Sequence, residues 1–208
     1  MRRQSAKAGA IFGISISILL VAGTLGRSDT AVENIVFIRH GEKPEKGLGQ
    51  LNCQGLNRAL ALPSVIDQSF GRPDAILAPN PLDRKTDDGE LFDYVRPLAT
   101  IEPTAIFFGL PVDVSIGFSE VKRLLFTLDQ LKYRNALILI AWEHKLIEET
   151  ARAVLEAHGG DAGVVPKWHD NDFDSIYVIT ITRTEDATNA IFTLKQEGLD
   201  GQKDTCPR

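Results

Sequence analysis

The sequence predicts a three-layer α/β fold in which a mostly parallel sheet is flanked by helices on both faces. Short apolar runs that suit buried strands alternate with amphipathic runs that suit helices, as is typical of α/β layer proteins. Residues 136–141 are uniformly apolar, as a central parallel strand should be. Residues 177–182 and 190–194 flank a polar turn, which predicts an antiparallel hairpin at the sheet edge.

The first half of the chain contributes two predicted strands and one predicted helix. Residues 33–39 form a short apolar run that suits a strand, and 41–52 are rich in Gly and Pro, which indicates a loop. Residues 54–70 have a helical pattern that we expect to be broken near Pro63. Residues 74–78 suit a second short strand.

The second half contributes the remaining helices. Residues 79–94 are polar and rich in Pro and Asp, so we expect an irregular excursion there. Residues 96–108 suit a helix that tolerates Pro97 at its start. Amphipathic periodicity predicts further helices over 119–133 and 145–158.

Composition limits the classes of protein to consider. The chain has 208 residues, 43% of them hydrophobic and 25% charged, which suits one globular domain with a sizeable core. Its 28 acidic residues outnumber its 23 basic ones, which argues against nucleic acid as a partner because a phosphate backbone needs a basic surface. Two cysteines cannot build a four-thiolate zinc site.

The N-terminus has the pattern of an export signal. Its first seven residues include Arg2, Arg3 and Lys7, and the next stretch, up to Gly26, carries no charge. This pattern is typical of a secretory signal peptide, although the run is also nearly long enough to stay as a membrane anchor. Either alternative places residues 31–208, the predicted domain, outside the cytoplasm, in the periplasm or medium or anchored and facing outward.

Loss of residues 1–26 would remove three basic residues and no acid, which takes the formal net charge from −5 to −8. In an oxidising compartment Cys53 and Cys206 can pair, or they can remain two free thiols. A bridge would tie the C-terminal tail to the segment after residue 40 and close a loop of about 150 residues, a strong constraint on the unfolded chain.

Two histidines follow predicted strands, at the edge where open α/β sheets hold their sites. Arg39 and His40 end the first strand, and Glu143 and His144 follow the strand over 136–141. An imidazole can attack phosphorus, and arginine guanidiniums can bind the charged oxygens of a phosphoryl group. These residues predict phosphoryl chemistry that needs no metal and no cofactor.

Arg39-His40-Gly41 after a first strand resembles the signature of the histidine phosphatase superfamily, which includes the cofactor-dependent phosphoglycerate mutases. Three other segments agree with that family in order and spacing: residues 51–59, residues 96–100 and His144. The resemblance spans about residues 34–182. It differs at Asn52, where the family usually has Thr or Ser, and in the longer, more acidic stretch before Arg96.

The resemblance implies a phosphatase that hydrolyses a small phosphomonoester without a metal. His40 would be the nucleophile that forms a phosphohistidine, and Arg39, Arg96 and His144 would bind the phosphoryl group. The residues directly after the nucleophile, Gly41, Glu42 and Lys43, are expected to contact the substrate.

The acid that protonates the leaving group is less well defined. No residue clearly matches the glutamate that serves as acid in the mutase branch; Glu143 is the first candidate and Glu42 the second. This gap leaves an alternative function open, a non-catalytic binding or sensor module for phosphate or another anionic ligand. The expected partner is a small phosphorylated compound, with membrane contact only through an uncleaved N-terminal segment; the oligomeric state stays open.

Two other histidines are expected to be structural. His158 lies on the apolar face of its predicted helix and suits a packing position. His169 belongs to an acidic run, 168–174, that resembles a calcium loop but has Ser175 where Gly is wanted and Ile181 where Glu is wanted. We expect that run to be a solvated loop near the pocket mouth.

Overall fold

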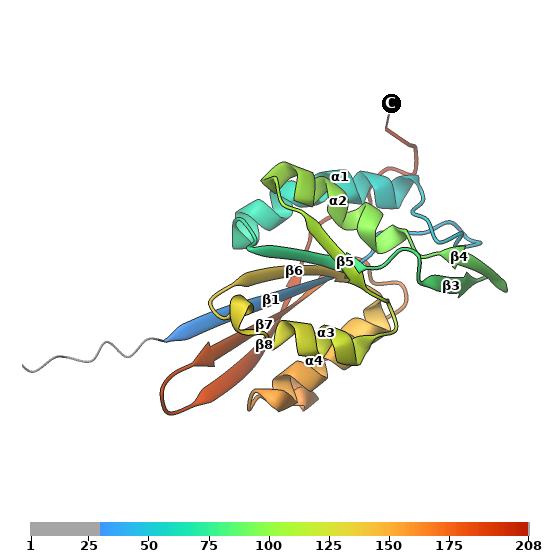
Figure 1. The fold of residues 1–208 in the computed structure, drawn as a ribbon. Coiled ribbons are helices and arrows are strands. Elements are labelled where there is room, and N and C mark those ends of the chain that lie inside the picture. The colour runs from blue at the N-terminus through green and yellow to red at the C-terminus, as the bar shows by residue number, and fades with distance from the viewer. Residues whose placement is uncertain (1–29, 208) are drawn as a thin grey trace, which may run out of the picture.

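A six-stranded sheet in the order β5-β2-β6-β1-β7-β8 forms the centre of the computed structural model, which describes residues 30–207 (Figure 1). Strands β5, β2, β6 and β1 are parallel, and β7 runs antiparallel between β1 and β8. This confirms the mostly parallel sheet with an antiparallel hairpin at its edge. The strands are β1 (Ala31–Arg39), β2 (Ala75–Pro79), β5 (Val112–Ile116), β6 (Leu137–Trp142), β7 (Ser175–Arg183) and β8 (Thr188–Gln196).

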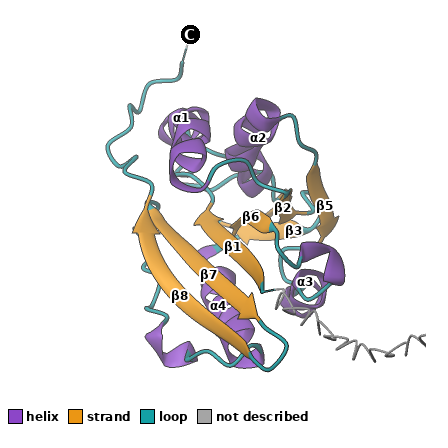
Figure 2. Cartoon of the chain, turned by 90° about the vertical axis from the view of Figure 1, so that its left-hand side faces the viewer, coloured by secondary structure: helices purple, strands orange, loops and turns teal. Residues whose placement is uncertain are grey.

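Helices cover both faces of the sheet, as predicted. Helices α1 (Cys53–Phe70) and α2 (Arg96–Phe108) lie on one face, and α3 (Val121–Leu128) and α4 (His144–Ala157) lie on the other (Figure 2). Two short 3-10 turns, Leu131–Tyr133 and Ala162–Val164, follow α3 and α4.

Strand β1 shows how the sequence separates the two cores. Side chains alternate across a strand, so Ile35 and Phe37 pack on the α3–α4 side, while Val36 and Ile38 pack on the α1–α2 side. All four side chains are fully buried. Arg39 is the last residue of β1, and His40 follows it directly; both lie beside the ring of Phe173.

Two helices, α1 and α3, differ from the sequence prediction. Helix α1 continues through Pro63 without a break, although proline cannot donate to the Ala59 carbonyl one turn earlier. Helix α3 ends at Leu128 instead of residue 133, and the 3-10 turn after it completes the connection to β6.

Two strand features were not predicted. Val112–Ile116 forms the edge strand β5, which is only five residues long. The polar excursion 79–94 folds into a separate hairpin of β3 (Arg84–Asp87) and β4 (Glu90–Asp93), in which Gly89, with a φ of 83°, occupies the turn. Figure 1 shows this hairpin beyond the end of the sheet where β1 terminates.

A disulfide joins Cys53, at the start of α1, to Cys206 in the C-terminal tail, which confirms the predicted pairing. The tail is also held by Asn57 of α1, whose Nδ2 donates to the carbonyls of Lys203 and Thr205 at 2.8 and 2.9 Å. The C-terminal tail therefore lies against the N-terminal half of α1.

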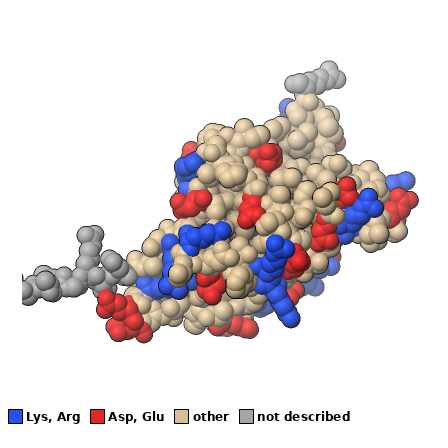
Figure 3. Space-filling model, in the orientation of Figure 1, with Lys and Arg blue, Asp and Glu red and all other residues tan. Residues whose placement is uncertain are grey.

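The predicted export segment, residues 1–26, lies outside the described residues. Across residues 30–207 there is no helix that combines the length and apolarity needed to cross a membrane. On the face shown in Figure 3, Lys and Arg side chains are interspersed with Asp and Glu.

Removal of the disulfide should destabilise the protein without changing the fold. A Cys53→Ala/Cys206→Ala variant frees a loop of 153 residues in the unfolded chain, and we expect the free energy of unfolding to fall by about 2–4 kcal/mol. Urea denaturation followed by circular dichroism measures this difference. Equal unfolding midpoints for the variant and the oxidised parent would contradict it.

Candidate active site

His40 lies directly after β1 and is buried, with 3% of its surface exposed. Its Nδ1 lies 2.8 Å from the Gly41 carbonyl oxygen, a contact that requires the proton on Nδ1. The Nε2 atom then carries the lone pair, and it accepts a hydrogen bond from Arg96 Nε at 3.3 Å. The backbone thus fixes the tautomer in which Nε2 is unprotonated.

The surroundings of His40 disfavour its protonation. Burial lowers the pKa of His40 well below its usual value, and the charges of Arg96, Arg39 and Lys85 lower it further. The ring is therefore neutral at neutral pH, which is the state that a nucleophilic attack on phosphorus requires.

Arg96 is the first residue of α2 and is held by a carboxylate from the excursion hairpin. Its Nη1 and Nη2 donate to the two carboxylate oxygens of Asp87 at 2.6 and 3.1 Å. Although burial acts to raise the pKa of Asp87, the hydrogen bonds from Arg96 and the Gly49 amide lower it overall. Sequence reasoning missed Asp87, because only the fold of the hairpin brings it to Arg96.

The contacts of Thr100 account for the four-residue spacing between Arg96 and Thr100 in the segment 96–100. One turn after Arg96 on α2, its hydroxyl donates to the Arg96 carbonyl and accepts the amide proton of Gly41, at 2.8 and 2.9 Å. This hydroxyl couples the helix that carries the arginine to the loop that carries His40. A Cβ on Gly41 would lie 3.0 Å from the backbone of Gly55, so this position requires glycine for close packing.

Arg39, the last residue of β1, contacts the loop before β7. Its Nη1 donates to the carbonyls of Asp170 and Asp172 at 2.8 and 2.7 Å, and its guanidinium lies 3.8 Å from the centre of the Phe173 ring. Its Nε is buried and has no hydrogen-bond partner among residues 30–207. One guanidinium donor of Arg39 is thus available to a ligand.

His144 begins α4 and lies between two carboxylates. Its Nδ1 is 3.0 Å from Glu143 Oε1, and its Nε2 is 2.7 Å from Asp170 Oδ1. Only the Asp170 contact has hydrogen-bond geometry, because Nδ1 has no hydrogen-bond partner among residues 30–207 and meets Glu143 at ion-pair distance alone. The His144 side chain is 7% exposed, whereas the Asp170 side chain is 80% exposed, so the Asp170 contact is the one that faces solvent.

Glu143 caps α4 through Oε2, which accepts the Leu146 amide proton at 3.0 Å. Burial acts to raise its pKa, but the close contact with His144 and the charges of Lys85 and His144 together bring it to about 2. Glu143 is therefore a carboxylate at neutral pH, which disfavours it as the proton donor in the free protein. It is well placed to orient His144.

Lys85 of β3 is a further cation at this site that the sequence did not single out. Its Nζ lies 3.7 Å from Glu143 Oε1 and above the rings of Tyr94 and Phe118. Its charge reaches His40, whose pKa it helps to lower. The only sequence signal for it was the unusual length of the excursion before Arg96.

Glu42 serves a second charged centre instead of the His40 site. Both of its carboxylate oxygens accept hydrogen bonds from Arg58 of α1, which is fully buried. Arg58 also pairs with Asp174, Glu197 and Asp200, at 3.1, 2.7 and 2.9 Å. These contacts fix α1, the site loop and the C-terminal segment together.

The other predicted site residues near His40 differ in what they contact. Gly41 contributes through its backbone, and Lys43 extends to the rim, where its Nζ lies 3.9 Å from Asp87. Asn52 fills the place of the usual Thr or Ser by capping α1: its side-chain oxygen accepts the Gly55 amide proton at 2.8 Å. The substitution therefore preserves the local structure.

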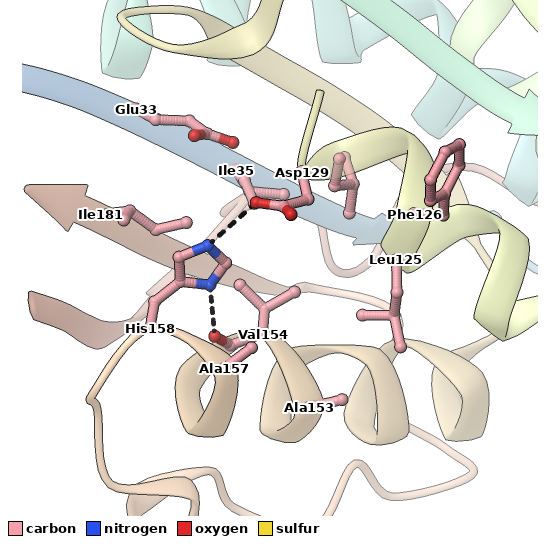
Figure 4. Close-up of a pocket in the computed structure, with 11 residues that line it drawn as sticks. Glu33, Ile35, Leu125, Phe126, Asp129, Ala153, Val154, Ala157, His158 and Ile181 are labelled. Carbon is pink, nitrogen blue, oxygen red and sulfur yellow. Dashed lines mark hydrogen bonds and ion pairs between the residues drawn. The ribbon is translucent and has the colours of Figure 1, made fainter. Parts of the chain in front are cut away.

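A cavity of about 290 Å³ lies away from this site, beside the start of β1 (Figure 4). His158 lines it and caps α4, with Nδ1 donating to the Val154 carbonyl at 2.9 Å and Nε2 lying 3.5 Å from Asp129. These contacts fit the structural position expected for His158. Within residues 30–207 no cluster of three or more His, Cys, Asp or Glu side chains is arranged to hold a metal ion.

No family model matches the chain, and no curated protein matches it in sequence. Solved structures match it in fold. The mycobacterial glucosyl-3-phosphoglycerate phosphatase Rv2419c with inorganic phosphate is 12% identical with a TM-score of 0.53, covering 77% of this chain and 95% of that one. The protein assigned as the phosphohistidine phosphatase SixA of Nakamurella multipartitia is 13% identical with a TM-score of 0.51, covering 79% and 95%.

This chain has the histidine phosphatase fold. A phosphoglycerate mutase from Bacillus anthracis is a further match, 12% identical with a TM-score of 0.50, covering 81% of this chain and 93% of that one. At these identities the likeness concerns the fold, and it confirms the architecture that the sequence resemblance implied. At the carboxyl ends of β1 and β6, Arg96 contacts His40, and Arg39 and His144 both contact Asp170.

His40 should stay neutral under conditions in which an ordinary histidine is half protonated. Because its pKa is lowered well below 6.5, the ring should keep its Nδ1–H tautomer as the pH falls through that value. Nitrogen-detected NMR of the folded protein measures this, with the same chain unfolded in urea as reference. A titration midpoint near 6.5 in the folded protein would contradict the environment described for His40.

Proposed function

We propose that this protein is an exported, metal-independent phosphatase that hydrolyses a small phosphomonoester through a phosphohistidine on His40. The observation that carries the proposal is the state of His40: buried, neutral, fixed by Gly41 and aimed through Nε2 at Arg96. Solved structures of this fold include a phosphatase in complex with inorganic phosphate, which supports the substrate class.

In the first step, the hydrogen bond from Arg96 Nε to His40 Nε2 breaks, the freed Nε2 lone pair attacks phosphorus, and the bond from phosphorus to the leaving oxygen breaks. Arg39 and Arg96 stabilise the charge on the phosphoryl oxygens, since guanidinium groups bind such oxygens with directed hydrogen bonds. In the second step, water attacks the phosphohistidine, inorganic phosphate leaves, and His40 returns to its neutral form.

The leaving oxygen needs a proton, and we assign it to Nε2–H of His144. Glu143 holds the ring through Nδ1 and stays ionised, in keeping with its pKa of about 2. In the second step His144 takes back a proton from the attacking water, so the cycle is balanced. Asp170, which is exposed and occupies Nε2 in the free protein, must move aside for the substrate.

Export is supported by two independent features. The chain begins with basic residues followed by a long uncharged run, and Cys53 and Cys206 form a disulfide of the kind that persists in oxidising compartments. We therefore place residues 31–208 in the periplasm or medium, or outside the membrane on an uncleaved anchor.

Hydrolysis of p-nitrophenyl phosphate in the presence of EDTA tests the proposed chemistry. We expect turnover that resists EDTA and falls by at least about 1,000-fold in His40→Ala, because the covalent step is lost. A His158→Ala variant, changed at a histidine far from the site, is the control and should keep its activity. A folded protein that binds phosphate but hydrolyses no ester would instead support a binding or sensor module.

The proton assignment makes a separate prediction for Glu143→Gln. If Glu143 acts only by orienting His144, Glu143→Gln should lower kcat on an alkyl phosphate with a poor leaving group by about 10- to 100-fold, and it should cause no further loss in a His144→Ala background, where no imidazole is left to orient. Steady-state kinetics on the two single variants and the double variant measure this. A further loss from Glu143→Gln in the His144→Ala background would show that Glu143 itself donates the proton.

A further inference from the structure

The excursion hairpin brings a lysine into the site that the sequence resemblance does not include. Lys85 lies on β3, opposite Phe92 of β4, and its side chain extends toward Glu143 and His40. Its Nζ is 5.1 Å from the centre of the Tyr94 ring, and that ring lies 6.0 Å from the ring of His40. The nucleophile and Lys85 are thus neighbours across a single aromatic side chain.

The ammonium group of Lys85 has no hydrogen-bond acceptor among the described residues. No hydrogen bond from Nζ is present among residues 30–207, and the nearest ion-pair partner, Glu143, is beyond hydrogen-bond distance at 3.7 Å. Its side chain is 25% exposed, and burial lowers its pKa. An ammonium has three donors, and a partly desolvated one is stabilised by an anion that accepts from them.

The other cations of the site are largely engaged. Both Nη atoms of Arg96 are bound to Asp87, and Nη1 of Arg39 is bound to backbone carbonyls. A phosphoryl group with two negative charges therefore meets only part of the donor capacity of the two arginines. Lys85 Nζ has an ion-pair contact with Glu143 but donates no hydrogen bond among residues 30–207, so its three donors can turn to an anion.

Resting on the function proposed above, we propose that Lys85 binds the phosphoryl group directly and is a substrate-binding cation supplied by the β3–β4 hairpin. The hairpin then has two tasks at the site, since Asp87 fixes the direction of Arg96 while Lys85 contacts the anion. The added length of the chain between β2 and α2 is explained by these two side chains.

The test compares binding of orthovanadate and inorganic phosphate, by calorimetry, in the parent and in Lys85→Met. We expect binding weaker by about 10- to 100-fold, the effect of removing one charge-assisted hydrogen bond, and partial recovery in Lys85→Arg. Arg84→Met is the matched control: it removes one positive charge from the adjacent residue of β3, whose side chain is 60% exposed and pairs with Asp93. Its affinity should change less than about twofold.

Thermal unfolding separates binding from folding. Lys85 makes a 3.7 Å ion pair with Glu143 and contacts two aromatic rings but donates no hydrogen bond, so Lys85→Met should stay folded with a stability close to that of the parent. A folded variant with unchanged phosphate and vanadate affinity would overturn the proposal. Failure of the proposed function gives a different result. A parent protein that binds phosphate but hydrolyses no ester would contradict the proposed function, while the effect of Lys85→Met on phosphate affinity could still be measured. A parent that binds neither anion would overturn both.

Discussion

The hydrogen bond from Arg96 Nε to His40 Nε2 connects the two halves of the site, and several other features serve to maintain it. His40 must be neutral to accept this bond, and burial together with nearby positive charge keeps it so. Arg96 must lie in one direction, and Asp87 and the first turn of α2 set that direction. Thr100 joins both partners by bonding to Gly41 and to the Arg96 carbonyl.

A second charged centre, around Arg58, holds the frame in which this contact forms. Arg58 is fully buried and pairs with carboxylates from the site loop, the start of β7 and the C-terminal segment. Burial raises the pKa of Glu197 to about 8, and pairing with Arg58 limits that rise. Breaking a buried pair leaves an uncompensated charge, so this centre links the active loop to the disulfide-bonded tail.

The β3–β4 hairpin before Arg96 adds two charged side chains to the site, Asp87 and Lys85. In the free protein each major cation faces an acceptor: Arg96 faces Asp87, His144 faces Glu143 and Asp170, and Arg39 faces backbone carbonyls. These contacts give the cations of the site partners in the absence of ligand. Lys85 faces only Glu143, at 3.7 Å and without a hydrogen bond, so its ammonium donors can bind an anion.

Local pattern determined most of the fold. The uniform run of β6, the alternation of β7 and the periodicity of α4 each depend on neighbouring residues alone, so strand, hairpin and helix were predictable. The sequence also pointed to Arg39, His40, Arg96 and His144, since each stands at the end of a strand or the start of a helix. The tertiary structure alone decided that Glu42 pairs with Arg58 and that Asp87 and Lys85 reach the site, because those partners are distant in sequence and a polar hairpin has no local signal for the surface it covers.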